Sequence, residues 1–339
     1  MEFWAISAVA FGLAAGISVF FRPSGRASAL GTKSLEKKHV VITGGSSGIG
    51  FAMAQEVILQ GGFVTLISRS YANLQAAVER LVKDLSCDPD RVLSKVADVS
   101  DHQAITQAIQ EAFQWKPIDF LICNAGLTRG GQLENQPVED MDLVIRTNLN
   151  GTVYPVHAAL PLMKERSKEH PGSIVFIGSQ ASLFVFYGHS VYTATKYAVK
   201  GLAESLKLEL TPYDISVSLA CPGFVDTPFL DEAEKEKDED DIKLLKIVNL
   251  YDRKNVEIPK NVAKKVLEGA KQGTFLITTN IYPGLFVSTL ARGFLPAESV
   301  GRCLLEMIMY FPFRALSLLG ANDIHKAILK YSKVNIMKM

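Results

Sequence analysis

A tyrosine and a lysine stand four residues apart in the second half of the chain, at Tyr192 and Lys196 in the run YTATK. Residues at this spacing share one face of a helix. An ammonium group beside a phenol lowers the pKa of the phenol from about 10 toward neutral pH. The pair therefore predicts a tyrosine that acts as a general acid, although the same spacing also recurs on solvated helix faces.

A serine that could assist this tyrosine, Ser179, stands 13 positions earlier, at the end of the apolar run SIVFIGS. A serine hydroxyl can donate a hydrogen bond to a carbonyl oxygen, which gains negative charge when a hydride reaches its carbon. The three residues together predict the reduction of a carbonyl compound. Ser182 is a second hydroxyl nearby, and we expect it to pack or to line the substrate.

A glycine-rich stretch, TGGSSGIG at 43–50, separates the apolar run HVVI from the helical pattern FAMAQEVILQ. Glycine lets backbone N–H groups approach a phosphate, and the start of a helix adds a favourable dipole. Such turns also occur for packing reasons alone. The predicted phosphate turn consists of Gly44, Ser46, Ser47, Gly48, Ile49 and Gly50.

The elements that must position these residues alternate between strand and helix from residue 39 to 280. Seven apolar, β-branched runs are separated by amphipathic segments: HVVIT, FVTLIS, RVLSKVA, IDFLIC, SIVFIGS, ISVSLAC and TFLITT. Continuous apolar strands joined by helical crossovers indicate a parallel sheet covered on both faces. The predicted fold is therefore a Rossmann-type α/β domain with a doubly wound, seven-stranded parallel sheet.

Two further motifs lie between the glycine turn and Ser179: NAG at 124–126, and TNLNG, which places Asn148 in a predicted long helix. With TGGSSGIG, Ser179 and YTATK, their order resembles the short-chain dehydrogenase/reductase family over residues 38–280. The resemblance implies that Lys196 also holds the nicotinamide ribose. It further implies that Asn148 positions a water molecule between the lysine and solvent.

The second predicted strand ends LISRS, without an acid at Ser68 and with Arg69 next. An acid at this place suits the ribose hydroxyls of NAD, whereas an arginine suits a 2′-phosphate. We therefore expect NADPH, the alternative being that Arg69 only caps a surface turn. The resemblance adds further cofactor contacts, partly from the loop CPGFVDTP: Asp98, Val99, Asn124, Ala125, Gly126, Tyr192, Lys196, Pro222, Gly223, Val225 and Thr227.

Charge and cysteine content exclude several function classes. Lys and Arg number 36 against 35 Asp and Glu, so no basic surface for nucleic acid is expected. The four cysteines are far apart and form neither a CxxC pair nor a metal-ligand spacing. We therefore expect no metal site and no disulfide framework, which fits a domain in the reducing cytosol.

The first 22 residues are predicted to be a membrane anchor, followed by a basic linker at 23–37. Residues 3–21 carry no charge over 19 positions, and at roughly 1.5 Å per residue a helix of that length crosses the hydrocarbon layer. A cleaved signal peptide, with ASA at 27–29, is the alternative. The basic residues after the span place the domain in the cytosol. A GxxxG pair, Gly12 and Gly16, could join two copies, so a homo-oligomer is possible.

Two segments near the end of the chain differ from the central domain in composition. Residues 281–339 are apolar but interrupted by charges and proline, so they form a re-entrant hairpin, interfacial helices or helices that cover the domain. Residues 231–243, DEAEKEKDEDDIK, predict a solvated, mobile helix. In the family that this chain resembles, the same region forms a lid over the substrate.

The whole chain resembles, within that family, the 3-ketodihydrosphingosine reductases, because the leading span and the apolar tail accompany the motifs. The resemblance implies an endoplasmic reticulum membrane protein that uses NADPH to reduce a long-chain lipid 3-ketone to a 3-hydroxyl. A membrane-anchored steroid or retinoid dehydrogenase and a non-catalytic scaffold are the alternatives. An apolar run either lines the alkyl chain or belongs to the core: Leu183, Phe184, Val185 and Phe186.

Overall fold

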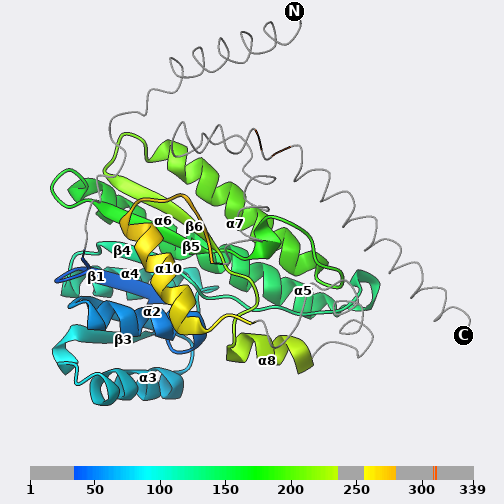
Figure 1. Ribbon diagram of the computed structural model, residues 1–339, viewed down its shortest axis with the longest axis horizontal. Coiled ribbons are helices and arrows are strands. Elements are labelled where there is room, and N and C mark those ends of the chain that lie inside the picture. Colours follow the sequence, from blue (N-terminus) through cyan, green and yellow to red (C-terminus); the bar gives the residue numbers. More distant parts are fainter. Residues whose placement is uncertain (1–33, 236–255, 280–307, 309, 311–339) are drawn as a thin grey trace, which may run out of the picture.

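The computed structural model describes residues 34–235 and 256–279, together with 308 and 310. Seven parallel strands form one sheet in the order β3, β2, β1, β4, β5, β6, β7 (Figure 1). The strands are β1 (His39–Thr43), β2 (Phe63–Ser68), β3 (Val92–Val96), β4 (Phe120–Cys123), β5 (Gly172–Ile177), β6 (Ile215–Cys221) and β7 (Leu276–Thr278). The predicted doubly wound fold is confirmed.

Helices connect the strands and cover the sheet. They are α2 (Gly48–Leu59), α3 (Tyr71–Asp84), α4 (His102–Trp115), α5 (Val138–Ile145), α6 (Gly151–Arg166), α7 (Ser190–Glu209), α8 (Pro228–Lys235) and α10 (Pro259–Lys271). Short turns of 3-10 helix are η1 (Pro89–Arg91), η2 (Leu133–Asn135) and η4 (Gln180–Ser182), and η3 (Arg146–Asn150) is a π-helical turn.

Both faces of the sheet are buried. In β1, Val40 and Ile42 pack into the core shared with α2, α3 and α10, whereas Val41 packs into the core shared with α4, α6 and α7. Because successive side chains of a strand point to opposite faces, a strand covered on both sides is apolar at most positions, and buried polar residues such as His39 and Thr65 are hydrogen-bonded. This two-sided burial explains why the strand runs were readable in the sequence.

The order in which the chain adds strands to the sheet reverses between β1 and β4. From β1 the chain proceeds outward through β2 and β3, and it then returns to place β4 on the other side of β1. Ile42 pairs with Leu66 of β2 and with Ile122 of β4, so the carboxyl ends of all three strands meet at one edge. In open α/β sheets, ligands bind in the crevice at such a switch point.

Several predictions fall on the ends of the chain. The anchor at 1–22 and the start of the linker lie outside the described residues, as does the extension at 281–339 apart from residues 308 and 310. Within the described part, no helix has the length and apolar character needed to cross a membrane. The charged segment at 231–243 begins as helix α8, and its remainder beyond residue 235 is outside the described part.

Candidate active site

The turn after β1 has the backbone conformation that glycine permits. Gly44 and Gly48 have φ angles of 63° and 53°, in the left-handed region. A Cβ atom on Gly48 would lie 3.2 Å from the Cγ2 atom of Thr227. A Cβ atom on Gly50 would lie 2.3 Å from the carbonyl oxygen of Gly44, so Gly50 serves the close packing of α2 on the turn.

Helix α2 begins directly at this turn. Its N-cap residue, Ser47, makes no side-chain cap bond, and its first turn carries no acidic residue. The N–H groups at the start of α2 are therefore not capped by the Ser47 side chain, and the positive end of the helix dipole is not offset there. The neighbouring Ser46 donates a hydrogen bond to Ser68 at the end of β2, 3.0 Å away. This is a suitable cradle for a phosphate group.

The NAG motif is fixed against the glycine turn. The amide of Asn124 donates to the carbonyl oxygens of Thr43 and Gly44, at 3.1 and 3.0 Å. In return, the hydroxyl oxygen of Thr43 accepts from the backbone N–H groups of Asn124 and Ala125. The two motifs, about 80 residues apart in sequence, thus form one rigid wall at the switch point.

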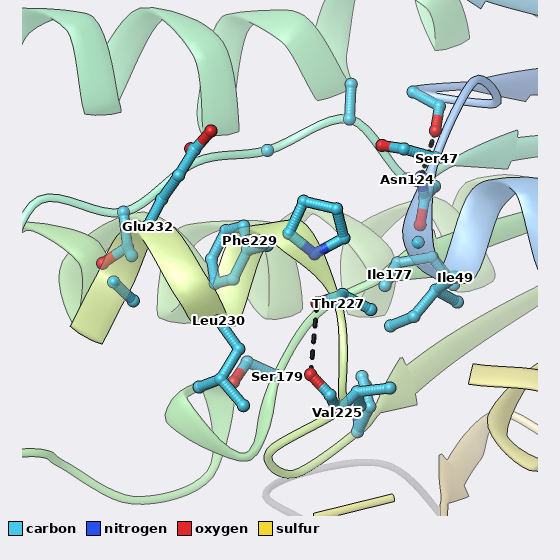
Figure 2. A pocket seen from close by; sticks show the side chains of 18 of the residues that line it. Ser47, Ile49, Asn124, Ile177, Ser179, Val225, Thr227, Phe229, Leu230 and Glu232 are labelled. Carbon is cyan, nitrogen blue, oxygen red and sulfur yellow. Dashed lines mark hydrogen bonds between the residues drawn. The ribbon is translucent and has the colours of Figure 1, made fainter. Parts of the chain in front are cut away.

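A cavity of about 410 Å³ opens along this edge. Figure 2 shows Ser47, Ile49 and Asn124 on one side of it and Phe229 and Glu232 of α8 on the other. Most of the predicted site residues line it: Gly44, Ser46, Ser47, Gly48, Ile49, Arg69, Val99, Asn124, Ala125, Gly126, Ser179, Tyr192, Lys196, Pro222, Gly223, Val225 and Thr227. Gly50, Asp98 and Asn148 do not form part of its lining.

Tyr192 lies in the first turn of α7 and is 9% exposed. Burial raises the pKa of its phenol to about 12, and a hydrogen bond with the Ser179 side chain opposes this rise. The phenol is thus a proton donor that stays protonated at neutral pH. The predicted lowering of its pKa by a neighbouring ammonium is wrong for this structure, because burial is the dominant effect.

Lys196 is turned toward the end of β5. Its Nζ atom donates to the carbonyl oxygen of Ile177 at 3.0 Å and lies 5.6 Å from the centroid of the Tyr192 ring. Burial lowers the pKa of this lysine to about 8, with Cys221 acting in the opposite direction. Lys196 therefore remains mostly charged at pH 7 but titrates within an experimentally accessible range.

Ser179 is held by a local network at η4. Its hydroxyl accepts from the backbone N–H of Ala181 at 3.1 Å, and its own N–H donates to the hydroxyl of Ser182 at 3.2 Å. Ser182 is completely buried and is not part of the cavity lining. Of the two expectations for Ser182, packing is the one that the structure supports, and its hydrogen bond to Ser179 was not foreseen.

Asn148 lies in the predicted long helix, at the π-helical turn η3 that joins α5 and α6 into one helical run from 138 to 166. Its side-chain oxygen accepts from the N–H of Leu127 at 2.8 Å. Its amide donates to the carbonyl oxygen of Leu127 and to the hydroxyl of Thr195. A Cβ atom on Gly126 would lie 3.2 Å from the Asn148 side-chain oxygen and 3.6 Å from Nζ of Lys196. Asn148 thus joins the chain after β4 to helix α7, close to Lys196.

Arg69 and Asp98 form a weak pair beside the cavity. The Nη1 atom of Arg69 lies 4.0 Å from a carboxylate oxygen of Asp98, and the arginine side chain is 59% exposed. The other carboxylate oxygen of Asp98 accepts from the N–H and hydroxyl of Ser100. An exposed pair at this distance contributes little to stability, so the guanidinium is available to a ligand.

One part of the cavity wall is apolar. The ring of Phe186 lies 5.9 Å from that of Phe224, and both pack against Leu230 of α8. Phe229 lies 6.1 Å from the ring of Tyr192. Of the apolar run expected either to line an alkyl chain or to form core, only Phe186 lines the cavity, since Leu183 and Phe184 pack in the core and Val185 is 71% exposed.

Sequence reasoning missed the contribution of α8. Phe229 and Leu230, which lie between the loop CPGFVDTP and the charged segment at 231–243, line the cavity together with Glu232 from that segment. The apolar pair at 229 and 230, directly before the charged run, was the available signal.

Comparison with known proteins adds to this geometry. Residues 38–238 match the family described as short chain dehydrogenase. The chain belongs to the short-chain dehydrogenase/reductase family. It is therefore an oxidoreductase, and the resemblance expected from the motif order is confirmed.

Members of the short-chain dehydrogenase/reductase family similar to this chain include two curated enzymes. A 3-dehydrosphinganine reductase of Arabidopsis thaliana is 34% identical over 299 residues, which cover 88% of each chain. The 3-ketodihydrosphingosine reductase of Mus musculus is 34% identical over 294 residues, 86% of each chain. A short-chain dehydrogenase/reductase from Burkholderia phymatum, solved in complex with NAD, is 26% identical, with a TM-score of 0.64 over 73% of this chain and 90% of that one.

Proposed function

We propose that this chain reduces 3-ketodihydrosphingosine to dihydrosphingosine with NADPH, as a step of sphingolipid biosynthesis. The observation that carries the proposal is the match, over most of the chain, to enzymes named for this reaction. The placement of the Ser179 and Tyr192 side chains together on the cavity lining supports it, because a ketone reductase needs two donors directed at one carbonyl oxygen.

The cavity fits a phosphorylated dinucleotide. The left-handed glycines and the α2 N-terminus, which lacks a side-chain cap, suit the diphosphate, and Arg69 suits a 2′-phosphate. When bound, NADPH supplies the hydride that goes to the carbonyl carbon. We assign the remaining contacts as the family resemblance implies, with Val99 and Asp98 toward the adenine and Lys196 toward the ribose. The loop residues Pro222, Gly223 and Val225 lie toward the nicotinamide, with Thr227 at its carboxamide.

The protein's own part of the reaction is to bind the ketone oxygen and to deliver a proton. Ser179 donates a hydrogen bond to that oxygen, and Tyr192, whose pKa of about 12 keeps it protonated, donates the proton. Lys196 is mostly charged at pH 7 and restores the proton to the tyrosine. Asn148 holds the segment beside Lys196 in place and, as the family resemblance suggests, positions the water that connects the lysine to solvent.

The substrate is an amino ketone with a long alkyl chain. The apolar wall of Phe186, Phe224 and Leu230 is the part of the cavity whose chemistry matches that chain. We also propose that the domain faces the cytosol at the endoplasmic reticulum membrane, where such a lipid dissolves. The uncharged stretch at 3–21 and the basic residues after it support this location.

The test is a turnover assay of the full chain in detergent or membranes. We expect NADPH consumption with 3-ketodihydrosphingosine and formation of dihydrosphingosine, identified by mass spectrometry, and no product from Tyr192→Phe. Retinal and a 3-keto-steroid are assayed in parallel. Faster reduction of either of these, or no product from the amino ketone, would overturn the proposal.

A further inference from the structure

Glu232 is the one carboxylate among the described residues that line the cavity. It stands three residues after Phe229 on α8, so the two side chains share a helix face. Figure 2 shows both extending to the same side of α8, whereas Leu230 points the other way. The ring of Phe229 in turn lies 6.1 Å from the ring of Tyr192, so the side of α8 that carries Phe229 and Glu232 is the side that faces Tyr192.

The surroundings of this carboxylate leave it available to a ligand. Glu232 is exposed, and within the described part of the chain it forms neither a hydrogen bond nor an ion pair. The other residues of α8 that line the cavity are apolar: Pro228, Phe229, Leu230 and Ala233. A carboxylate at a concave, largely apolar surface raises the local concentration of cations.

The other charged groups of the cavity have the opposite sign. Arg69 lies at the end of β2 and Lys196 lies beside Ile177, and both are cationic at pH 7. Glu232 is therefore the described lining residue whose charge is opposite to that of an ammonium group. The proposed substrate carries an amine on the carbon next to the ketone, so the ammonium must lie close to Tyr192 when the ketone is in place.

We propose that Glu232 binds the ammonium group of the substrate and thereby selects amino ketones over neutral long-chain ketones. This inference rests on the proposed function and adds a residue to it. The two groups of the substrate then bind at different parts of the cavity: the ammonium binds at Glu232, and the alkyl chain lies along Phe186, Phe224 and Leu230. A carboxylate that pairs with an ammonium also gains strength from the apolar surroundings.

The test compares two substrates in the full-length protein. They are 3-ketodihydrosphingosine and the same ketone with hydrogen in place of the amine. For Glu232→Gln we expect KM for the amino ketone to rise about tenfold, the size of one charge-assisted hydrogen bond, with kcat little changed. KM for the deaminated ketone should stay within about twofold, since that substrate has no charge to lose. Glu232→Asp should retain part of the discrimination.

A matched control is Glu209→Gln, which removes an exposed carboxylate at the end of α7, outside the cavity. It should leave both KM values unchanged. Equal effects of Glu232→Gln on the two substrates would overturn the role of Glu232 while leaving the proposed reduction intact. Failure of the unaltered protein to reduce the amino ketone would overturn the proposed function, and the inference with it.

Discussion

The Nζ atom of Lys196 lies 3.0 Å from the carbonyl oxygen of Ile177, held by the end of β5 and not by the phenol oxygen of Tyr192. The two residues are buried together, and burial favours the neutral form of each. The lysine consequently loses its proton well before the tyrosine does. As the pH rises during reduction, Lys196, which restores the proton to Tyr192, therefore titrates before Tyr192, which donates the proton to the substrate.

This order predicts the pH dependence of reduction. Lys196 loses its charge as the pH rises through about 8, whereas Tyr192 keeps its proton up to about 12. We expect kcat with saturating NADPH to be level below pH 8 and to fall above it. The kcat of Lys196→Met should be low at every pH and should not decrease further above pH 8, as measured by steady-state rates from pH 6 to 10. The control is Lys200→Met, one turn further on α7, whose kcat should decrease above pH 8 as in the unaltered protein.

Removing the proton donor should abolish catalysis without loss of the cofactor site. Tyr192→Phe keeps the ring that faces Phe229 and His189 and deletes only the hydroxyl. We expect kcat to fall by about 10²–10⁴, the usual contribution of a general acid. NADPH affinity, measured by fluorescence titration, should change less than about twofold. Tyr197→Phe on the same helix should be as active as the unaltered protein, and near-normal kcat in Tyr192→Phe would refute the assignment.

The preference for NADPH over NADH should depend on Arg69. Because its pair with Asp98 spans 4.0 Å and is exposed, Arg69→Ala should cost less than about 0.5 kcal/mol of unfolding free energy. KM for NADPH should nevertheless rise about tenfold, with KM for NADH within twofold. Lys83→Ala, which removes an exposed cation from α3, should change neither value. A similar rise for both cofactors would mean that Arg69 does not contact a 2′-phosphate.

The stability of the domain should fall in mild acid because of His39. This ring is buried, donates from Nδ1 to the carbonyl oxygen of Lys116 and accepts at Nε2 from Thr65, so it is neutral, and burial lowers its pKa to about 4. In the unfolded chain the pKa is near 6.5, and the unfolded state therefore binds more protons between pH 6.5 and 4. Between pH 7 and 5 this histidine should remove about 2 kcal/mol of unfolding free energy.

The measurement for His39 is urea unfolding followed by tryptophan fluorescence, since Trp115 packs edge-on against the histidine ring at 5.1 Å. His39→Gln keeps one donor and one acceptor but cannot titrate. Its unfolding free energy should decrease less between pH 7 and 5 than that of the unaltered protein. The same decrease in both would show that other groups cause the acid sensitivity.

The strands and the cofactor edge were predictable because their causes are local. A strand buried on both faces is apolar at most positions, and β6 was predicted at its observed bounds, 215–221, as were β1 and β2. The glycines at 44 and 48 were recognisable because a left-handed backbone excludes most other residues. The apolar strand runs and the glycines were therefore sufficient to predict the turn after β1, the switch point and most of the cavity lining.

The remaining errors concern features that depend on tertiary contacts. The four-residue spacing of Tyr192 and Lys196 places them on one face, but it gives neither the direction of the lysine side chain nor the burial of the phenol. All four residues from Leu183 to Phe186 are apolar, so the sequence gives no sign of which of them pack in the core and which line the cavity. Helix α8 reaches the cavity because the loop after β6, which lines the cavity from Pro222 to Thr227, leads directly into α8.

The hydrogen bonds of Asn148 have a consequence for how the domain assembles. They join Asn148 to Leu127, 21 positions away, and to Thr195, 47 positions away, so each contact carries the entropic cost of closing a long loop. The N–H of Leu127 should exchange with solvent only when Asn148 moves away from it. Because the same Asn148 side chain also bonds Thr195 of α7, we expect this N–H to become protected during refolding together with the docking of α7.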